Sequence, residues 1–180
     1  MRVFKTAFDR RSLAPAIAAG LLAATFQQAR AQDNQAGFEA WVVRLYGDEI
    51  ARNKSPASPS GDATLDLFTP EVRALIVESR KHTLPASEPD GPILHLVLGW
   101  GALPNREIIL NRVASTPAPD GERRATVDLG IAGNARRLIV TGVFDSQAKR
   151  WRIADIDYGS GSLDATLIGR MRRMASWPLR

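Results

Sequence analysis

Apolar residues recur with a helical period in residues 36–50, AGFEAWVVRLYGDEI. They fall at positions i, i+3, i+4, i+7 and i+8 of one stripe, which is typical of an amphipathic helix that packs against a core. We therefore expect a helix here, followed by a loop over residues 53–61, which are rich in Pro, Ser and Gly. The stripe consists of Phe38, Trp41, Val42, Leu45 and Tyr46.

A second helical region follows that loop. Asp62 can cap a short turn, and Thr-Pro-Glu at residues 69–71 marks the start of a longer helix. Thr is a favoured N-cap, Pro suits the first helical position, and an acid suits the first turn. We expect this helix to end near His82, before the LPASEPDGP break. The apolar residues of the region are Leu65, Phe68, Val72, Leu75 and Ile76.

From residue 106 the hydrophobic period changes to alternation. Residues 106–116, 123–133, 136–146 and 150–158 alternate apolar and polar side chains as half-buried strands do. The breaks TPAPDG, GNA and SQAK are short enough for antiparallel hairpins. The preceding ILHLVLGWGALP, residues 93–104, fits a buried strand or a packed loop and stays unassigned. The expected inner-face residues are Trp41, Leu45, Val127, Leu129, Phe144, Trp151 and Ile153.

A short amphipathic helix is predicted near the C-terminus. Ser160 or Ser162 can cap it, and the arginines of its last turns complement the helix dipole. Helices, then strands, then a short helix indicate an α+β fold. We expect N-terminal helices packed on a curved antiparallel sheet of about four strands, in keeping with that layer architecture. The apolar face of the last helix would be Leu163, Leu167, Met171 and Met174.

Residues 1–31 have the features of a cleaved export signal. A basic segment precedes SLAPAIAAGLLAATF, and the following ARA, which ends at Ala31, has the small-x-small form of a signal-peptidase site. The apolar run is shorter than the ~20 residues of a transmembrane helix. Arg10 and Arg11 resemble a twin-arginine signal, so that route and the general secretory route are both open. We expect cleavage after Ala31, a periplasmic or secreted location, and one domain over residues 32–180.

The export segment also explains most of the positive charge. The whole chain has a formal net charge of +5, and this segment holds five of the 24 basic and one of the 19 acidic residues. The remaining 19 basic and 18 acidic side chains leave a net charge of +1. We therefore expect no nucleic-acid partner, and no integral membrane segment after signal removal. The chain has no cysteine, which excludes disulfides, thiolate metal sites and a lipoprotein anchor.

Three stretches carry a resemblance to a known fold: LDLFTPEVRALI at 65–76, ATVDLGI at 125–131 and KRWRIADIDY at 149–158. Together with the order of elements, they resemble the nuclear-transport-factor-two-like cone, a cystatin-like α+β fold. Over residues 36–170 the chain is similar to small exported bacterial proteins that form a domain of unknown function. The resemblance implies a half-open cone with a pocket between the sheet and the first helices. Family members include isomerases and dehydratases that use Asp, His or Tyr there, and inert binding or dimerisation modules. No catalytic set carries over residue by residue.

Asp155 and Asp157 are the first candidates for chemistry. Two residues apart on a regular strand, they share a face with Trp151 and Ile153. On the inner face, burial would raise the pKa of a carboxyl and suit it to proton transfer. We favour the alternative, because a buried unpaired carboxylate is costly. In that case the strand bulges or ends near Ala154, and both acids turn to solvent or to helix-capping roles.

The remaining candidates are histidines and aromatic residues. His95 interrupts an apolar run and is an acid–base candidate, although a hydrogen-bonded structural histidine is commoner. His82 is expected to be a solvated helix end. Tyr158 is a further catalytic candidate through its hydroxyl. Trp100 stands between two glycines and would anchor a ligand or partner if exposed. The ligand-binding candidates are Trp41, Trp100, Trp151 and Tyr46.

Motifs that resemble cofactor sites are incomplete. DIDYGSGSLDAT lacks ligands and the glycine of a calcium loop. GWGALP has proline where a dinucleotide loop needs its third glycine, and SQAK lies in a predicted hairpin turn rather than opening a helix. Two distant histidines do not make a metal site. We therefore expect no metal and no cofactor.

Three functional hypotheses follow. The leading one is a soluble periplasmic module that binds a small apolar ligand or a protein partner without catalysis. The rival is an isomerase or dehydratase that uses Asp155 or Asp157 with His95 or a tyrosine. The third is an inhibitor or immunity-type protein that contacts its partner through the loop around Trp100. A homodimer through the outer face of the sheet is a further hypothesis, based on the parity of Ile139, Val143 and Ile156.

Overall fold

The computed structural model describes residues 37–54, 62–82, 95–99, 106–159 and 165–177. All of them belong to the unit formed by residues 35–180. None of the helices described there is long and apolar enough to cross a membrane. The elements are a helix over residues 37–53, α2 (Asp62–Leu65), α3 (Pro70–Ser79), β1 (Ile108–Pro117), the 3₁₀ turn η1 (Pro119–Gly121), β2 (Arg123–Ile131), β3 (Asn134–Asp145), β4 (Arg150–Asp157) and α4 (Leu167–Met174).

The strands form one antiparallel sheet in the chain order β1-β2-β3-β4. Between β2 and β3 the chain turns through Ala132 and Gly133, both at positive φ, as a tight two-residue hairpin requires. Helices precede the sheet and a short helix follows it. These features confirm the predicted α+β class and all of the predicted strands.

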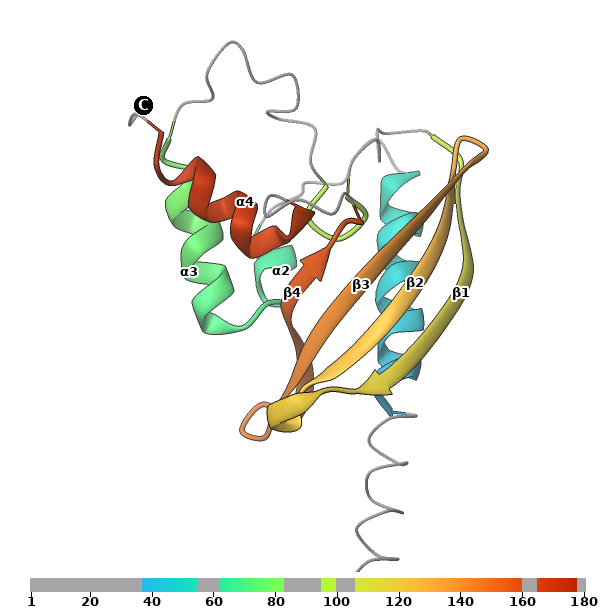
Figure 1. Ribbon diagram of the computed structural model, residues 1–180, viewed down its shortest axis with the longest axis horizontal. Helices are drawn as coiled ribbons and strands as arrows, with labels where there is room; N and C mark the ends of the chain where they lie inside the picture. The colour runs from blue at the N-terminus through green and yellow to red at the C-terminus, as the bar shows by residue number, and fades with distance from the viewer. Residues whose placement is uncertain (1–36, 55–61, 83–94, 100–105, 160–164, 178–180) are drawn as a thin grey trace, which may run out of the picture. The chain divides into compact units, whose positions relative to one another are not determined.

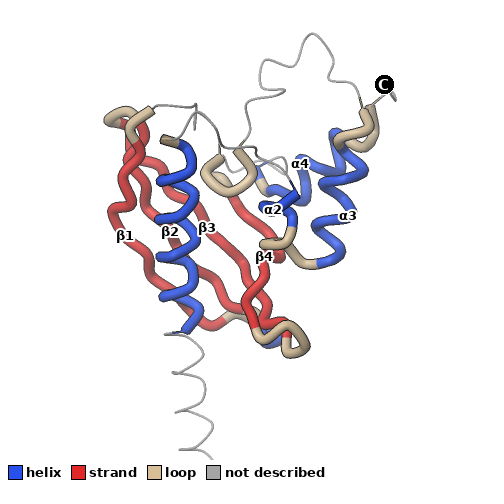
Figure 2. Tube along the Cα trace, turned by 180° about the vertical axis from the view of Figure 1, so that it is seen from behind, coloured by secondary structure: helices blue, strands red, loops and turns tan. Residues whose placement is uncertain are grey.

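The helix over residues 37–53 covers one face of the sheet, while α2, α3 and α4 gather on the β4 side (Figures 1 and 2). The apolar stripe of the first helix faces the sheet, as predicted. Phe38, Val42, Leu45 and Tyr46 are buried, and Trp41 is half-buried. Their partners across the core are Ala125, Val127, Leu129, Ile131, Leu138, Val140, Ile153 and Ile156.

A bulge at Ala154 reverses the face of the sheet on which each later side chain of β4 lies. The residues that flank it, Ile153 and Asp155, pair with successive residues of β3, so Ala154 has no partner in the register. Ile153 and Ile156 are therefore both fully buried. Asp155 and Asp157 turn to the opposite face of the sheet. The favoured prediction of a bulge near Ala154 is confirmed.

Neighbouring segments cover the free edge of β4. The link between α2 and α3 runs parallel to it, and Ile153 exchanges two backbone hydrogen bonds with this link, at 2.9 and 2.8 Å. Further along, the Tyr158 N–H donates to the Ala165 carbonyl at 2.8 Å. This cover satisfies backbone groups that an open edge would offer to another chain.

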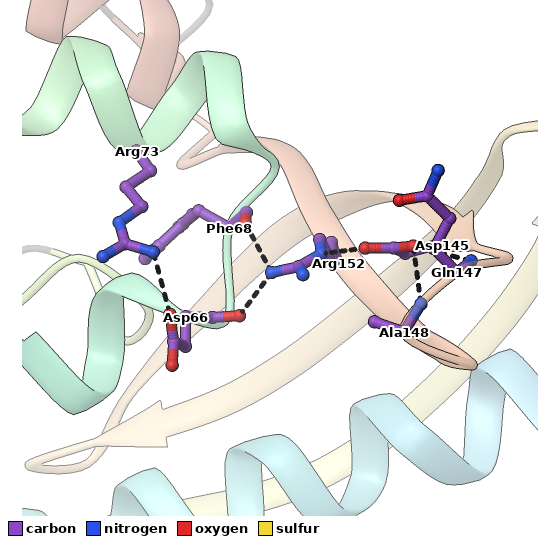
Figure 3. Close-up of polar contacts among 7 residues, drawn as sticks. All are labelled: Asp66, Phe68, Arg73, Asp145, Gln147, Ala148 and Arg152. Carbon is purple, nitrogen blue, oxygen red and sulfur yellow. Dashed lines mark hydrogen bonds and ion pairs between the residues drawn. The ribbon is translucent and has the colours of Figure 1, made fainter.

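Arg152 ties the α2–α3 link to the hairpin between β3 and β4 (Figure 3). Its Nε donates to Asp145 Oδ2 at 2.7 Å, and its Nη1 donates to the carbonyls of Asp66 and Phe68 at 3.1 and 3.4 Å. Two hydrogen bonds hold the pKa of Asp145 below its ordinary value. The bond from the backbone N–H of Ala148 has the largest effect, and the bond from Arg152 comes next. The network fixes the link against the sheet.

The start of α3 agrees with the prediction, but its end does not. Thr69 is the N-cap, and its Oγ1 accepts the N–H of Val72 at 3.4 Å. The helix ends at Ser79 rather than near His82. His82 is 8% exposed, and its Nδ1 contacts the carbonyl oxygen of Trp177. The expectation of a solvated histidine is therefore wrong, because the chain after α4 packs over it.

The cap of α4 is a residue that the sequence analysis did not consider. Thr166 is the N-cap, and its Oγ1 accepts the N–H of Gly169 at 3.0 Å. Ser160 and Ser162, the expected caps, lie outside the described residues, and the helix begins after both. Arg170, the fourth residue of this helix, is buried.

Candidate functional site

Asp155 lies on the face of the sheet away from the core and supports the start of α4. Its Oδ1 accepts the N–H groups of Ile156 at 2.9 Å and Ile168 at 3.1 Å. The first N–H groups of a helix have no partner within the helix, so the carboxylate satisfies one of them. Burial raises the pKa of Asp155, and the hydrogen bonds from Ile168 and Ile156 oppose that rise. This is the helix-capping role that was the alternative to acid–base chemistry.

Asp157 closes the turn after β4. Its Oδ1 accepts the Gly159 N–H at 2.8 Å. Gly159 has a φ of +81°, and a Cβ there would lie 2.8 Å from the Arg137 carbonyl oxygen, so the turn requires glycine. Asp157 therefore acts in local backbone structure.

Tyr46 and Tyr158 converge on a turn formed by residues 95–99, which we call the core turn. The Tyr46 hydroxyl donates to the Val97 carbonyl at 3.1 Å, and the Tyr158 hydroxyl donates to the Leu96 carbonyl at 2.6 Å. Burial raises the pKa of both phenols above the ordinary value of 10.0. Both hydroxyls therefore stay protonated and serve as donors to the backbone.

His95 begins the core turn and engages both imidazole nitrogens. Nδ1 accepts the N–H groups of Val97 and Leu98 at 3.4 and 3.2 Å. Nε2 lies 3.5 Å from Glu49 Oε2. An imidazole that accepts at Nδ1 carries its hydrogen on Nε2 when neutral. Burial, and then the charge of Arg52, lower the pKa of His95 to about 4, so the ring is neutral at neutral pH.

Glu49 is a buried acid that the sequence analysis missed. It lies on the helix over residues 37–53 and is only 2% exposed, with Oε1 2.6 Å from Arg52 Nη2. Burial raises the pKa of Glu49, and Arg52 opposes the rise. Its position three residues after Tyr46 places an acid on the apolar stripe of the helix. That break in the pattern was the available signal, because an acid is seldom buried without a partner.

The buried side chains of Glu49, Tyr46 and Tyr158 and the half-buried side chain of His95 thus form a polar cluster around the core turn. It unites two of the catalytic candidates, His95 and Tyr158, with a ligand-binding candidate, Tyr46. The two acids of β4 lie outside this cluster. Asp155 accepts a hydrogen bond from the start of α4, and Asp157 accepts one in the turn after β4. The hydrogen bonds of the polar cluster hold the backbone of the core turn. In the part of the chain that the structure describes, no group of three or more acids and histidines is placed to hold a metal.

Four aromatic rings form a second group, the aromatic cluster, where β3 leads into β4. Trp41 stacks on Phe38 at 5.7 Å between ring centroids, and Trp151 packs against Phe38 at 4.8 Å. Phe144 meets Trp151 edge-on at 5.2 Å. Phe38 is buried, the two tryptophans are half-buried, and Phe144 is 46% exposed. Aromatic pairs in such geometries contribute ~0.5–1.5 kcal/mol each beyond area burial.

Two of the predicted ligand-binding residues, Trp41 and Trp151, therefore lie together. Tyr46 belongs to the polar cluster instead, and Trp100 lies outside the described residues. Phe144 has the predicted inner-face parity but is largely exposed, because it lies at the end of its strand beside the hairpin. Ile156 is in the core rather than on the outer face, because the bulge shifts its parity. Ile156 is therefore no longer one of the outer-face residues that support the homodimer hypothesis.

Comparisons with other proteins assign no family to the chain. No protein-family model matches it, and neither does any curated protein or solved structure. The resemblance to the nuclear-transport-factor-two-like cone stays a prediction.

Proposed function

We propose that this chain is a non-catalytic binding module that acts after export and binds an apolar partner through the aromatic cluster. The observation that carries the proposal is the set of partly exposed rings of Trp41, Trp151 and Phe144 around the buried ring of Phe38. Tryptophan is enriched at binding hot spots, and aromatic rings offer large apolar area at small entropic cost. The partner would supply an apolar group, from a small ligand or from a protein side chain.

The base of the aromatic cluster is held in place by the fold. Phe38 lies directly over Gly142 in β3, where a Cβ would come within 2.3 Å of the ring atom Cε2. The two tryptophans rest on this buried ring from different elements, the first helix and β4. A contact surface whose rings are fixed before binding loses less entropy when a partner arrives.

The polar cluster supports a module without catalysis. A general acid or base must be able to reach a proton of its substrate. His95 engages both nitrogens, and the hydroxyls of Tyr46 and Tyr158 donate to backbone carbonyls. Asp155 is engaged by two backbone N–H groups. The candidate groups thus act on the fold.

The probe for the aromatic cluster is 1-anilinonaphthalene-8-sulfonate, an apolar fluorescent dye. We expect Phe144→Ser to weaken dye binding about tenfold, because removal of one hot-spot ring costs on the order of 1–2 kcal/mol. The matched control is Ile109→Ser on β1, since Ile109 is 51% exposed and Phe144 is 46% exposed. A fluorescence titration of each purified protein measures the dissociation constant.

Equal dye affinity in Phe144→Ser and Ile109→Ser would reject the aromatic cluster as the contact surface. Native mass spectrometry of the protein released from the periplasm separates the two kinds of partner. A small added mass that the Phe144→Ser variant loses identifies a ligand, and a heavier complex that the same variant loses identifies a protein partner.

A further inference from the structure

We propose that the core turn, residues 95–99, is an acid-released plug. At neutral pH it seals the end of the core beside the polar cluster, and it leaves when the imidazole of His95 gains a second proton. This inference concerns the polar cluster and is independent of binding at the aromatic cluster.

The core turn is seated in the core. Val97 and Leu98 are 0% and 1% exposed. The Gly99 N–H donates to the His95 carbonyl at 2.7 Å and closes the turn. Gly99 has a φ of +78°, and a Cβ there would lie 2.8 Å from the Tyr158 ring. The turn therefore fits closely against Tyr158, and the side chains of Val97 and Leu98 lose contact with water.

The unprotonated Nδ1 of His95 holds the core turn in place. It accepts two backbone N–H groups of the turn, those of Val97 and Leu98, as the side-chain oxygen of Asn or Asp does in a capping position. Protonation places a hydrogen on Nδ1, so that Nδ1 and the N–H groups of Val97 and Leu98 are then all donors that face one another. Both hydrogen bonds are then lost, and the buried N–H groups are left without an acceptor unless the turn leaves the core.

The charges around His95 favour release in acid. Arg52 repels an imidazolium ion, whereas the Glu49 carboxylate, 3.5 Å from Nε2, attracts it. Burial raises the pKa of Glu49, so this attraction weakens as the pH falls. Among the described residues, the titratable and charged groups that face the core turn are Glu49, Arg52, Tyr46 and Tyr158. Tyr46, Asp155 and Arg170 act in turn on the hydroxyl of Tyr158.

The size of the effect follows from the two states of His95. The pKa of His95 is about 4 in the sealed turn. A solvated imidazole has a pKa near 6.5, so protons bind the released state better. The seal is therefore complete above pH ~6.5 and weakens as the pH falls toward 4, and the release equilibrium grows on the order of 100-fold between pH 7 and pH 4.

Amide hydrogen exchange in the full chain tests the plug. The exchange rates of the Val97 and Leu98 amides are measured by NMR and converted to protection factors. Protection factors remove the intrinsic pH dependence of exchange. We expect protection to fall on the order of 100-fold between pH 7 and pH 4, well beyond any fall at Val127 and Val140 in the sheet core. In His95→Asn the side-chain oxygen accepts the same N–H groups at any pH, so the excess fall should vanish.

An equal fall in His95→Asn would overturn the proposal, and so would a fall at the turn no larger than that in the sheet. If His95→Asn does not fold, a ¹⁵N NMR titration of the wild-type imidazole replaces it, with His82 as the other histidine. The expected result is a bare Nδ1 at neutral pH and a midpoint near 4 that coincides with loss of protection. A protonated Nδ1 at neutral pH, or a midpoint near 6.5, would overturn the plug.

Discussion

Phe38 of the first helix packs directly on Gly142 of β3. A Cβ at residue 142 would lie 2.3 Å from the Phe38 ring, which is fully buried and cannot swing away into solvent. We therefore expect Gly142→Ala to lower the free energy of unfolding by about 1–3 kcal/mol, as overpacked cores do. Equilibrium urea unfolding measures the change. The same shift of Phe38 should weaken dye binding at the aromatic cluster, because Trp41 and Trp151 rest on this ring.

Gly130→Ala is the matched control for this substitution. Gly130 is also a strand glycine with negative φ, but a Cβ there would meet its nearest neighbour, Asn111 Nδ2, at 3.6 Å, an ordinary contact. We expect its free energy of unfolding to stay within about 0.5 kcal/mol of the wild type or to rise slightly. Equal destabilisation by both alanines would mean that the contact with Phe38 is not what requires glycine at residue 142.

At the scale of elements, the position of α4 depends on the side chain of Asp155. Burial raises its pKa, so at neutral pH the folded protein bears the cost of an ionised carboxyl. Asn offers the same acceptor oxygen without charge. We expect Asp155→Asn to unfold with equal or higher free energy than the wild type at pH 7, and the difference to shrink as the pH falls through the pKa of Asp155. Asp155→Ala removes the acceptor and should cost about 1 kcal/mol.

Urea unfolding of both variants at neutral and acidic pH checks this ordering. If Asp155→Asn is instead destabilised as much as Asp155→Ala, the negative charge rather than the acceptor oxygen is what this site requires. That result would contradict the prediction that a neutral acceptor is sufficient to cap α4.

The strands of this fold were predictable from the sequence, because largely alternating apolar and polar residues, separated by short turn-forming breaks, mark them. The bulge in β4 was harder to place. Ile153 and Ile156 are spaced so that only a break in the alternation can bury both, yet the position of the break depends on which residues of β3 pair with them. Periodicity within one strand does not contain that register, although the cost of a buried carboxylate does favour a bulge near Ala154.

The polar cluster was not predictable in the same way. Glu49 interrupts the apolar stripe of the first helix, which marks it as unusual. Its partner His95 lies in residues 93–104, whose pattern fits a buried strand or a packed loop equally well, and Tyr158 follows the last strand. Only the folded core brings these three elements together, so residue spacing along the chain holds no sign of the pairing.

At the scale of the whole molecule, the first helix serves both clusters. Phe38 and Trp41 near its start belong to the aromatic cluster, and Glu49 and Arg52 near its end belong to the polar surroundings of the core turn. The two proposals can therefore be tested separately. Dye binding at neutral pH reports on the aromatic cluster, and exchange at Val97 and Leu98 reports on the polar cluster.

Residues 1–31 have the features of an export signal whose cleavage and route can each be measured. If ARA is the cleavage site, the exported protein begins at Gln32, and intact mass spectrometry of a periplasmic extract should give the mass of residues 32–180. Ala31→Leu should leave the uncleaved chain, because signal peptidase requires a small residue there. The route is tested by replacing Arg10 and Arg11 with lysines, with Arg2→Lys as a control that changes an arginine outside the pair.

Two outcomes of the paired lysine substitution are informative because the charge of the segment is unchanged in both variants. Loss of export with the paired substitution, and not with Arg2→Lys, identifies twin-arginine transport, which carries folded proteins. Normal export in both identifies the general secretory route, in which the domain folds after crossing the membrane. Full-length protein in the cytoplasm in every case would contradict export. It would also remove the support that residues 1–31 give to the proposal that the aromatic cluster binds its partner outside the cell membrane.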